Sequence, residues 1–160
     1  MPEGDAELAD LYRDVLLDYY RSPAHKGKVE DPDLAARGFS PTCGDEIEVT
    51  ARREGGRLAR LRFAGHGCVI SQASSAMMAE ALEGKALDEV RALIKSFGDV
   101  MVRQAALDSL PEALEETKAL EGVRRFPARV KCAMLSWNTL EQGLSVGPGA
   151  ESAQYMETGG

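Results

Sequence analysis

The chain has 160 residues, of which 44% are hydrophobic and 28% are charged, and its formal net charge is -7. This length suits one domain that buries a core without disulfides, and the composition is ordinary for a globular protein. The acidic balance and the lack of a basic stripe with interleaved aromatics argue against nucleic-acid binding, and no apolar run approaches the length of a membrane span.

Cysteine usage and the N-terminus indicate the compartment. The acidic N-terminus lacks the positively charged start and the apolar run of a secretory signal peptide. Three cysteines cannot all pair within one chain, so a disulfide framework would leave at least one thiol over. We therefore expect a cytoplasmic protein with free or metal-bound thiols.

The first predicted element is an amphipathic helix. Apolar residues recur at three- and four-residue steps between Asp5 and Arg21, and Pro23 prevents the helix from continuing. A polar, irregular stretch follows. It contains His25, which we expect to be a solvated loop residue.

A β-hairpin is predicted next. Apolar and polar residues alternate over residues 46–52, and a returning apolar pattern covers residues 58–63. Gly55 and Gly56 lie between the two runs and favour a tight turn. A weaker strand signal lies around residues 38–40.

The rest of the chain is expected to be mainly helical. Apolar periodicity with glycine or proline stops predicts helices over residues 69–82, 87–97, 112–121 and 128–144. The interval 99–111 is ambiguous, with some helical character. We expect one domain over residues 1–146 and a flexible C-terminal tail over residues 147–160, which is rich in Gly, Ser and Glu. Strands before helices predict an α+β fold, in which a small antiparallel sheet of two to three strands carries helices packed on one face.

The three cysteines, Cys43, Cys68 and Cys132, carry the candidate chemistry. Cys43 lies in a polar turn two residues before Asp45, and Gly44 between them lets the backbone bend. Cys68 opens a predicted helix, and the positive end of the helix dipole favours a thiolate there.

Cys132 follows two cations, Arg129 and Lys131, which would offset the charge of an anionic ligand set. Three sulfurs and the carboxylate of Asp45 match the donors of a tetrahedral zinc site, and thiolates also suit iron–sulfur ligation. The spacing lacks the Cys-x-x-Cys regularity of a zinc finger, and Cys132 on an apolar helix face also fits a small buried side chain. Convergence of these donors is therefore a hypothesis for the structure to test.

His66 lies between two glycines, two residues before Cys68. It could support a metal site from outside the ligand set, or act as the base for a Cys68 nucleophile in a thiol hydrolase. No acid that would orient such a base is evident. A purely structural zinc module is a further alternative.

Three motifs together resemble the U-type iron–sulfur cluster assembly family, the group of NifU N-terminal, IscU and SufU proteins. The motifs are Cys43-Gly44-Asp45, Gly67-Cys68 followed by Ile70 to Met78, and Arg129 to Cys132 running into Leu135-Ser136-Trp137. The resemblance extends to about Leu144. Two features are similar to the SufU branch in particular: the long interval between Cys68 and Cys132, and Lys131 where IscU scaffolds carry a histidine.

The resemblance implies a SufE/NifU-like fold, with zinc bound by Cys43, Asp45, Cys68 and Cys132. It also implies a sulfurtransferase-like acceptor that takes sulfane sulfur from a cysteine desulfurase. Downstream partners would be an iron–sulfur assembly complex or apo-proteins. Cys43 is the expected sulfur acceptor. The alternative is a scaffold on which a [2Fe–2S] cluster is assembled on the same four residues and passed to apo-proteins.

Overall fold

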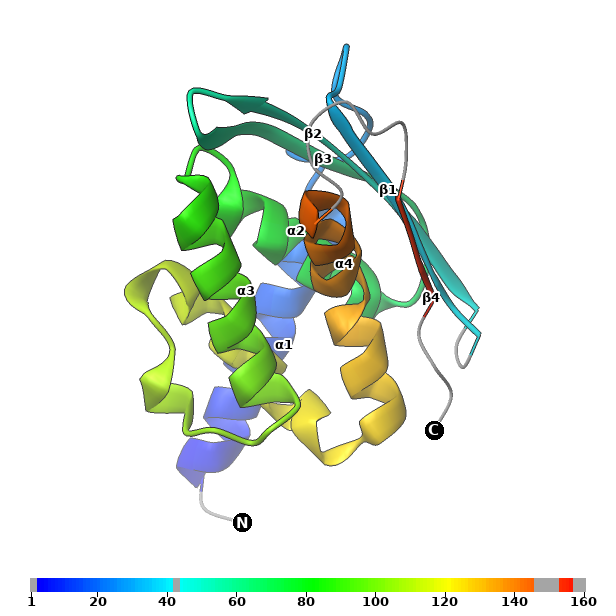
Figure 1. The fold of residues 1–160 in the computed structure, drawn as a ribbon. Helices are drawn as coiled ribbons and strands as arrows, with labels where there is room; N and C mark the ends of the chain where they lie inside the picture. The colour runs from blue at the N-terminus through cyan, green and yellow to red at the C-terminus, as the bar shows by residue number, and fades with distance from the viewer. Residues whose placement is uncertain (1–2, 42–43, 146–152, 157–160) are drawn as a thin grey trace.

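The computed structural model describes residues 3–41, 44–145 and 153–156, and it consists of a sheet with helices packed against one face (Figure 1). This arrangement confirms the predicted α+β class. The first three strands form an antiparallel meander. They are β1 (Leu34–Ser40), β2 (Asp45–Glu54) and β3 (Arg57–His66).

Glycines form the turn between β2 and β3, as the sequence predicted. Gly55 and Gly56 both have positive φ, 59° and 74°, which is the conformation that a two-residue type I′ hairpin requires. The signal at residues 38–40 is the end of a longer strand, β1. A register shift between Arg52 and Arg53 marks a bulge that the alternation pattern did not predict.

A fourth strand, β4 (Ala153–Met156), pairs in parallel with β1, so the strand order is β3-β2-β1-β4. Figure 1 shows it at the margin of the sheet beside β1. The composition of residues 147–160 predicts a flexible tail, and four residues of that range form this strand instead. It was missed because four residues among Gly, Ser and Glu give too short an alternation to recognise.

The helices follow the predicted order. They are α1 (Glu3–Arg21), α2 (Val69–Leu82), α3 (Leu87–Met101) and α4 (Pro127–Ser145). The ambiguous interval 99–111 contains the end of α3 and a short 3₁₀ helix, η1 (Leu107–Ser109). In the described ranges, every helix is too short or too polar to span a bilayer.

The acidic segment predicted as a short helix over residues 112–121 is longer and narrower than expected. It forms η2 (Glu112–Arg125), a 3₁₀ segment. Its buried positions include Leu114, Thr117, Leu120 and Val123, which recur every three residues. A 3₁₀ helix has three residues per turn, so this spacing places all four side chains on one face.

The core lies between the helices and the sheet. Trp137 of α4 is fully buried, and its ring stacks on Phe97 of α3 with centroids 4.0 Å apart and planes 16° apart. Phe63 of β3 is buried in the same cluster. The middle of α4 is therefore fixed within the core, which leaves the N-terminal half of that helix to carry the candidate site.

Candidate metal centre

Asp45 and Cys68 meet where a strand end approaches a helix start. Asp45 is the first residue of β2 and is only 3% exposed, and Cys68 is the N-cap of α2. The Asp45 Oδ1 accepts a hydrogen bond of 3.1 Å from the backbone N–H of Cys68, and Oδ2 lies 3.6 Å from the Cys68 Sγ. The hairpin and the helix thus bring a carboxylate and a thiol together across 23 residues of chain.

The Cys68 sulfur also caps α2. The backbone N–H of Ser71 donates to Sγ at 3.4 Å, and the Ser71 hydroxyl donates to the Cys68 carbonyl oxygen at 3.2 Å. A thiol here takes the place of the hydroxyl or carboxylate that usually caps a helix. Ser71 is a site residue that was not predicted from the sequence, although it lies at the third helical position after the helix-opening Cys68, where an N-cap side chain binds the backbone.

Gly67 leaves no room for a side chain beside this contact. A Cβ on Gly67 would collide with the Ser71 hydroxyl and would come within 2.9 Å of the Asp45 carboxylate. The glycine before Cys68 therefore allows the backbone to pass directly against the two side chains that position the thiol.

Cys132 completes the group in the described part of the chain. It lies in the second turn of α4 and is buried, 4% exposed, whereas Cys68 is exposed. One ligand atom each of Asp45, Cys68 and Cys132 lies within 4.8 Å of the others. Three of the four residues predicted to bind metal thus converge.

The donor set and its spacing fit a zinc ion. Tetrahedral zinc with bonds of about 2.3 Å to sulfur places neighbouring ligand atoms about 3.8 Å apart. The observed limit of 4.8 Å is close enough for small side-chain rotations to close the site. One exposed and two buried ligands also leave an open side from which a fourth ligand can approach.

Cys43, the fourth predicted ligand, lies outside the described residues. Two nearby residues, Ser40 and Gly44, have described positions next to Asp45. Ser40 pairs with Asp45 across the β1–β2 ladder, and the backbone N–H of Gly44 donates to the Ser40 carbonyl oxygen at 2.8 Å. Gly44 has a φ of 71°, a left-handed conformation that favours glycine.

A largely apolar cavity of about 490 Å³ opens beside the two described cysteines. The start of α2 and the start of α4 form part of its wall, and α1 contributes the rest. Its lining residues are Arg13, Leu16, Leu17, Cys68, Val69, Ile70, Ala128, Arg129 and Cys132. A reactive sulfur at this site would therefore face a space that admits a partner's side chain.

The predicted supporting residues lie around the site in different ways. Arg129 is exposed, lines the cavity and lies over the Phe126 ring at 5.5 Å from its centroid. Lys131 is half-buried beside Cys132.

His66 is exposed at the end of β3, and within the described ranges it has no hydrogen bond or ion pair with Cys68. The Cys68 Sγ instead contacts Asp45 and Ser71.

His25 is not a freely solvated loop residue. Its side chain is 18% exposed, and Nε2 lies 3.4 Å from a carboxylate oxygen of Glu83 at the end of α2. Burial alone would raise the pKa of Glu83, but hydrogen bonds from Leu61 and Arg62 and the charges of Arg62 and His25 together lower it. This cluster ties the loop, β3 and α2 together away from the cysteines.

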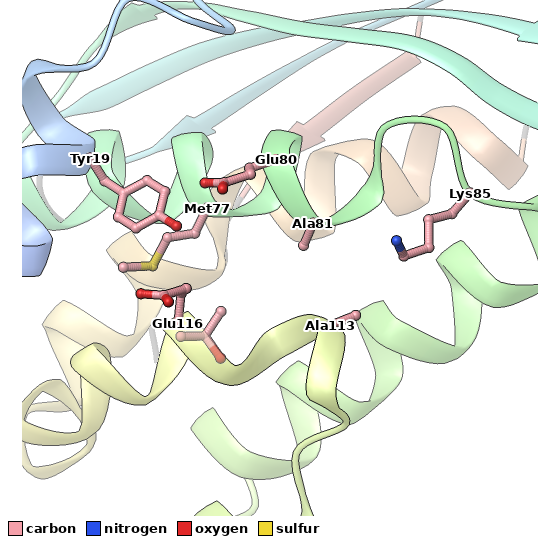
Figure 2. A pocket seen from close by; sticks show the side chains of 8 residues that line it. Tyr19, Met77, Glu80, Ala81, Lys85, Ala113 and Glu116 are labelled. Atoms are coloured by element: carbon pink, nitrogen blue, oxygen red, sulfur yellow. The ribbon is translucent and has the colours of Figure 1, made fainter.

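A second cavity, of about 180 Å³, lies between α1, α2 and η2 and contains none of the predicted site residues. Figure 2 shows Tyr19, Glu80 and Glu116 gathered at one end and Lys85 at the other. Partial burial raises the pKa of Tyr19, and a hydrogen bond to Glu80 and the charges of Glu80 and Glu116 raise it further. The phenol therefore stays protonated, and this cavity offers no thiol chemistry.

Comparisons with known proteins agree with the motifs. The family model of the NifU-like N terminal domain matches residues 11–133. The zinc-dependent sulfurtransferase SufU of Bacillus subtilis (strain 168) is 40% identical over 141 residues, which cover 88% of this chain and 94% of that protein. The iron–sulfur cluster assembly scaffold protein IscU of Streptococcus pyogenes serotype M1 is 36% identical, with 87% and 86% covered.

Solved structures share the fold. A crystal structure from Fervidobacterium islandicum AW-1, described provisionally as an iron–sulfur cluster assembly scaffold protein for the SUF system, superposes with a TM-score of 0.72 at 31% identity. The match covers 81% of this chain and 93% of that one. A NifU-like N-terminal protein of Brucella abortus gives a TM-score of 0.77 at 24% identity, covering 86% and 94%, and supports the fold alone.

Proposed function

The chain belongs to the family of NifU-like N-terminal domains, and on that basis we propose that it is an iron–sulfur cluster assembly protein whose zinc-held cysteines accept sulfur from a cysteine desulfurase. The resemblance that the motifs suggested is thereby confirmed at the level of the family. The SufU relative, named a zinc-dependent sulfurtransferase, supports the finer assignment.

The observation that carries the proposal is the convergence of Asp45, Cys68 and Cys132 beside an open cavity. Asp45 and Cys132 are buried, so contact with water does not explain why their side chains lie together. A buried carboxylate and two thiols that meet in one spot suit a bound cation, which pairs with them in place of water. Two sulfurs and one oxygen select zinc over magnesium or calcium, which prefer oxygen ligands alone.

Cys43 is proposed as the fourth ligand. It precedes Asp45 by two residues, and two residues of extended chain span at most about 7 Å, so its sulfur can reach the site. Three thiolates and one carboxylate around a divalent ion give a formal charge of about -2. Lys131 beside Cys132 and Arg129 at the cavity would offset part of that charge. When bound, zinc would keep the thiols ionised and would not undergo redox chemistry itself.

Cys43 is also the proposed sulfur acceptor, because it is carried by the hairpin connection while Cys68 and Cys132 are anchored on helices. Its thiolate would attack the terminal sulfur of a persulfide on the desulfurase cysteine. A new S–S bond would form on Cys43, the old S–S bond would break, and the desulfurase cysteine would leave as a thiolate. The exchange needs no external oxidant or reductant. It does need reduced thiols, which suits the cytoplasm.

Sulfur transfer from radiolabelled cysteine tests this assignment. A purified cysteine desulfurase should transfer label to the wild-type protein, and reductant should release it. Cys43→Ser should lose the label. A Cys43→Ser protein that accepts label at the wild-type rate would rule out Cys43 as the acceptor. Zinc analysis of protein purified without added metal should give one zinc ion per chain.

A scaffold for a [2Fe–2S] cluster is the second candidate, because the relative from Streptococcus pyogenes is named a scaffold protein. The same four residues would hold the cluster as cargo, since thiolates suit both zinc and iron–sulfur ligation. Anaerobic reconstitution separates the two roles. A stoichiometric cluster that passes to an apo-protein favours the scaffold, whereas zinc retention with sulfur acceptance favours the sulfur carrier.

A further inference from the structure

The two anchored cysteines lie on different helices, so something must hold those helices in register. Cys68 is the N-cap of α2 and Cys132 lies in α4. Figure 1 shows the two helices under the same face of the sheet, and they pack against one another. The separation of the two sulfurs depends on how α2 sits along and around α4.

A buried serine joins the two helices near the site. The Ser74 Oγ donates a hydrogen bond of 2.6 Å to the carbonyl oxygen of Ala133, the residue after Cys132. The Ser74 Oγ also accepts a hydrogen bond of 2.9 Å from Nε1 of Trp137. Ser74 is fully buried, at 0% exposure, so both bonds lie away from water.

These bonds specify geometry in a way that apolar packing cannot. Hydrophobic contacts are non-directional, whereas a hydroxyl that donates to one atom and accepts from another fixes both a distance and an angle. One partner is the backbone beside Cys132, and the other is an indole one turn further along α4. The indole is itself held by its stack on Phe97.

The constraint reaches Cys68 through α2. Ser74 lies six residues after Cys68, which is about 9 Å along a helix. The intervening turn is tied by the Ser71 N–H to the Cys68 sulfur and by the Ser75 hydroxyl to the Ser71 carbonyl oxygen at 2.7 Å. A shift of Ser74 against Ala133 would therefore carry the Cys68 sulfur with it.

We propose that Ser74 is a positioning residue that sets the separation of the Cys68 and Cys132 sulfurs, and with it the affinity and geometry of the metal site. The proposal rests on the proposed function, because it assumes that these sulfurs share a metal ion. The two hydrogen bonds of the Ser74 hydroxyl run to Ala133 and Trp137, which are not ligands. The role of Ser74 is to fix α2 on α4 at the level where the two thiols face each other.

The chain offers a matched control for the removal of this hydroxyl. Ser75 is on the same helix and is 1% exposed, and among the described residues its hydroxyl donates to the Ser71 carbonyl oxygen within α2. Ser74→Ala and Ser75→Ala therefore delete the same atom at the same depth, but the first breaks hydrogen bonds to α4 and the second a hydrogen bond within α2. A loss of stability common to both variants would not by itself distinguish them.

The experiment measures metal binding rather than sulfur transfer. Each full-length variant is loaded with Co²⁺, whose thiolate charge-transfer and d–d absorption report the ligands and their geometry. Zinc affinity is measured by competition with a chelator. We expect Ser74→Ala to weaken zinc binding about 10-fold and to alter the Co²⁺ d–d bands, while Ser75→Ala stays within about twofold of wild type.

The outcomes separate the two proposals. If wild-type protein shows no thiolate–cobalt absorption, the metal site itself fails. If wild type shows it and Ser74→Ala matches wild type in affinity and spectrum, or Ser75→Ala weakens binding equally, the positioning role is overturned. Should Ser74→Ala not fold, Ser74→Thr decides. It keeps the hydroxyl but adds a methyl group at a fully buried point between α2 and α4, so it should displace the two helices and change the Co²⁺ spectrum and the zinc affinity. An unchanged spectrum and affinity would overturn the proposal.

Discussion

Asp45 contacts Cys68 through both of its carboxylate oxygens, one with the backbone N–H and the other with the sulfur. The first contact fixes the start of α2 against the start of β2. The second leaves an oxygen beside the thiol, where both can serve one metal ion. Asp45 thus combines a structural hydrogen bond with a candidate ligand atom, and the two roles can be separated by substitution.

Asp45→Asn should separate them. The amide oxygen can still accept the Cys68 N–H, so the fold should persist, but the negatively charged ligand is lost. We expect zinc affinity to fall by at least about 10-fold, as for other changes next to a metal. Chelator competition measures the change. Glu46→Gln is the control, because this neighbouring carboxylate is half exposed and pairs with Arg37. An Asp45→Asn affinity within twofold of wild type would remove Asp45 from the ligand set.

Gly67→Ala should disturb the site through a single added carbon. The new Cβ would force the Ser71 hydroxyl and the Asp45 carboxylate to move. Overpacking of this kind costs about 1–3 kcal/mol, and zinc affinity should fall with it. Gly122→Ala is the matched control, because a Cβ there meets nothing within 4 Å. Urea unfolding and zinc competition on both variants check the prediction, and equal effects at both glycines would contradict it.

Removal of the metal should leave the protein folded. The site lies at the ends of β2, α2 and α4, while the core around Trp137 and Phe97 needs no ligand from it. We expect the chelated protein to keep its far-UV circular dichroism. Its Tm should be lower because zinc binds the native state in preference to the unfolded chain. Loss of the folded state on chelation would instead favour a purely structural zinc module.

Glu83 should make stability depend on acid pH. Its folded pKa is lowered below 4.5, so its contribution is present above that pH and is lost as the pH falls through the folded value. Glu83→Gln should cost about 1–2 kcal/mol at neutral pH, because charged hydrogen bonds from Leu61 and Arg62 are weakened. The difference from wild type should shrink below pH 4.5.

Denaturant unfolding at a series of pH values measures the Glu83 effect. Glu115→Gln serves as control, since the Glu115 side chain is 58% exposed and its pair with Lys118 should contribute little to stability. A gap between Glu83→Gln and wild type that stays constant into strong acid would contradict the assigned cause.

The elements that the sequence predicted well are those whose signal is local. The Gly55-Gly56 turn requires positive φ at both positions, so it located the hairpin within a residue. Cys68 at the start of a helix followed from the apolar periodicity after Val69. These features depend on backbone geometry that a single residue type favours, and tertiary contacts did not override them.

The elements that were missed depend on partners far along the chain. β4 forms only because β1 offers an edge, and nothing inside residues 153–156 announces that partner. The contact of the His25 ring needs Glu83, 58 residues away. The direct contact between Asp45 and Cys68 was likewise not predictable from the sequence pattern, although the family resemblance implied that both residues bind the same metal ion.

The coverage of the sheet margins has a consequence for how the protein behaves at high concentration. β4 covers the outer side of β1, and the loop near Lys26 pairs with the outer side of β3 through Gly27, His25 and Phe63. Uncovered strand edges invite pairing with other chains and aggregation. A chain without Ala153–Met156 would leave this side of β1 unpaired and should self-associate more readily, so we expect these four residues to limit strand addition by other chains.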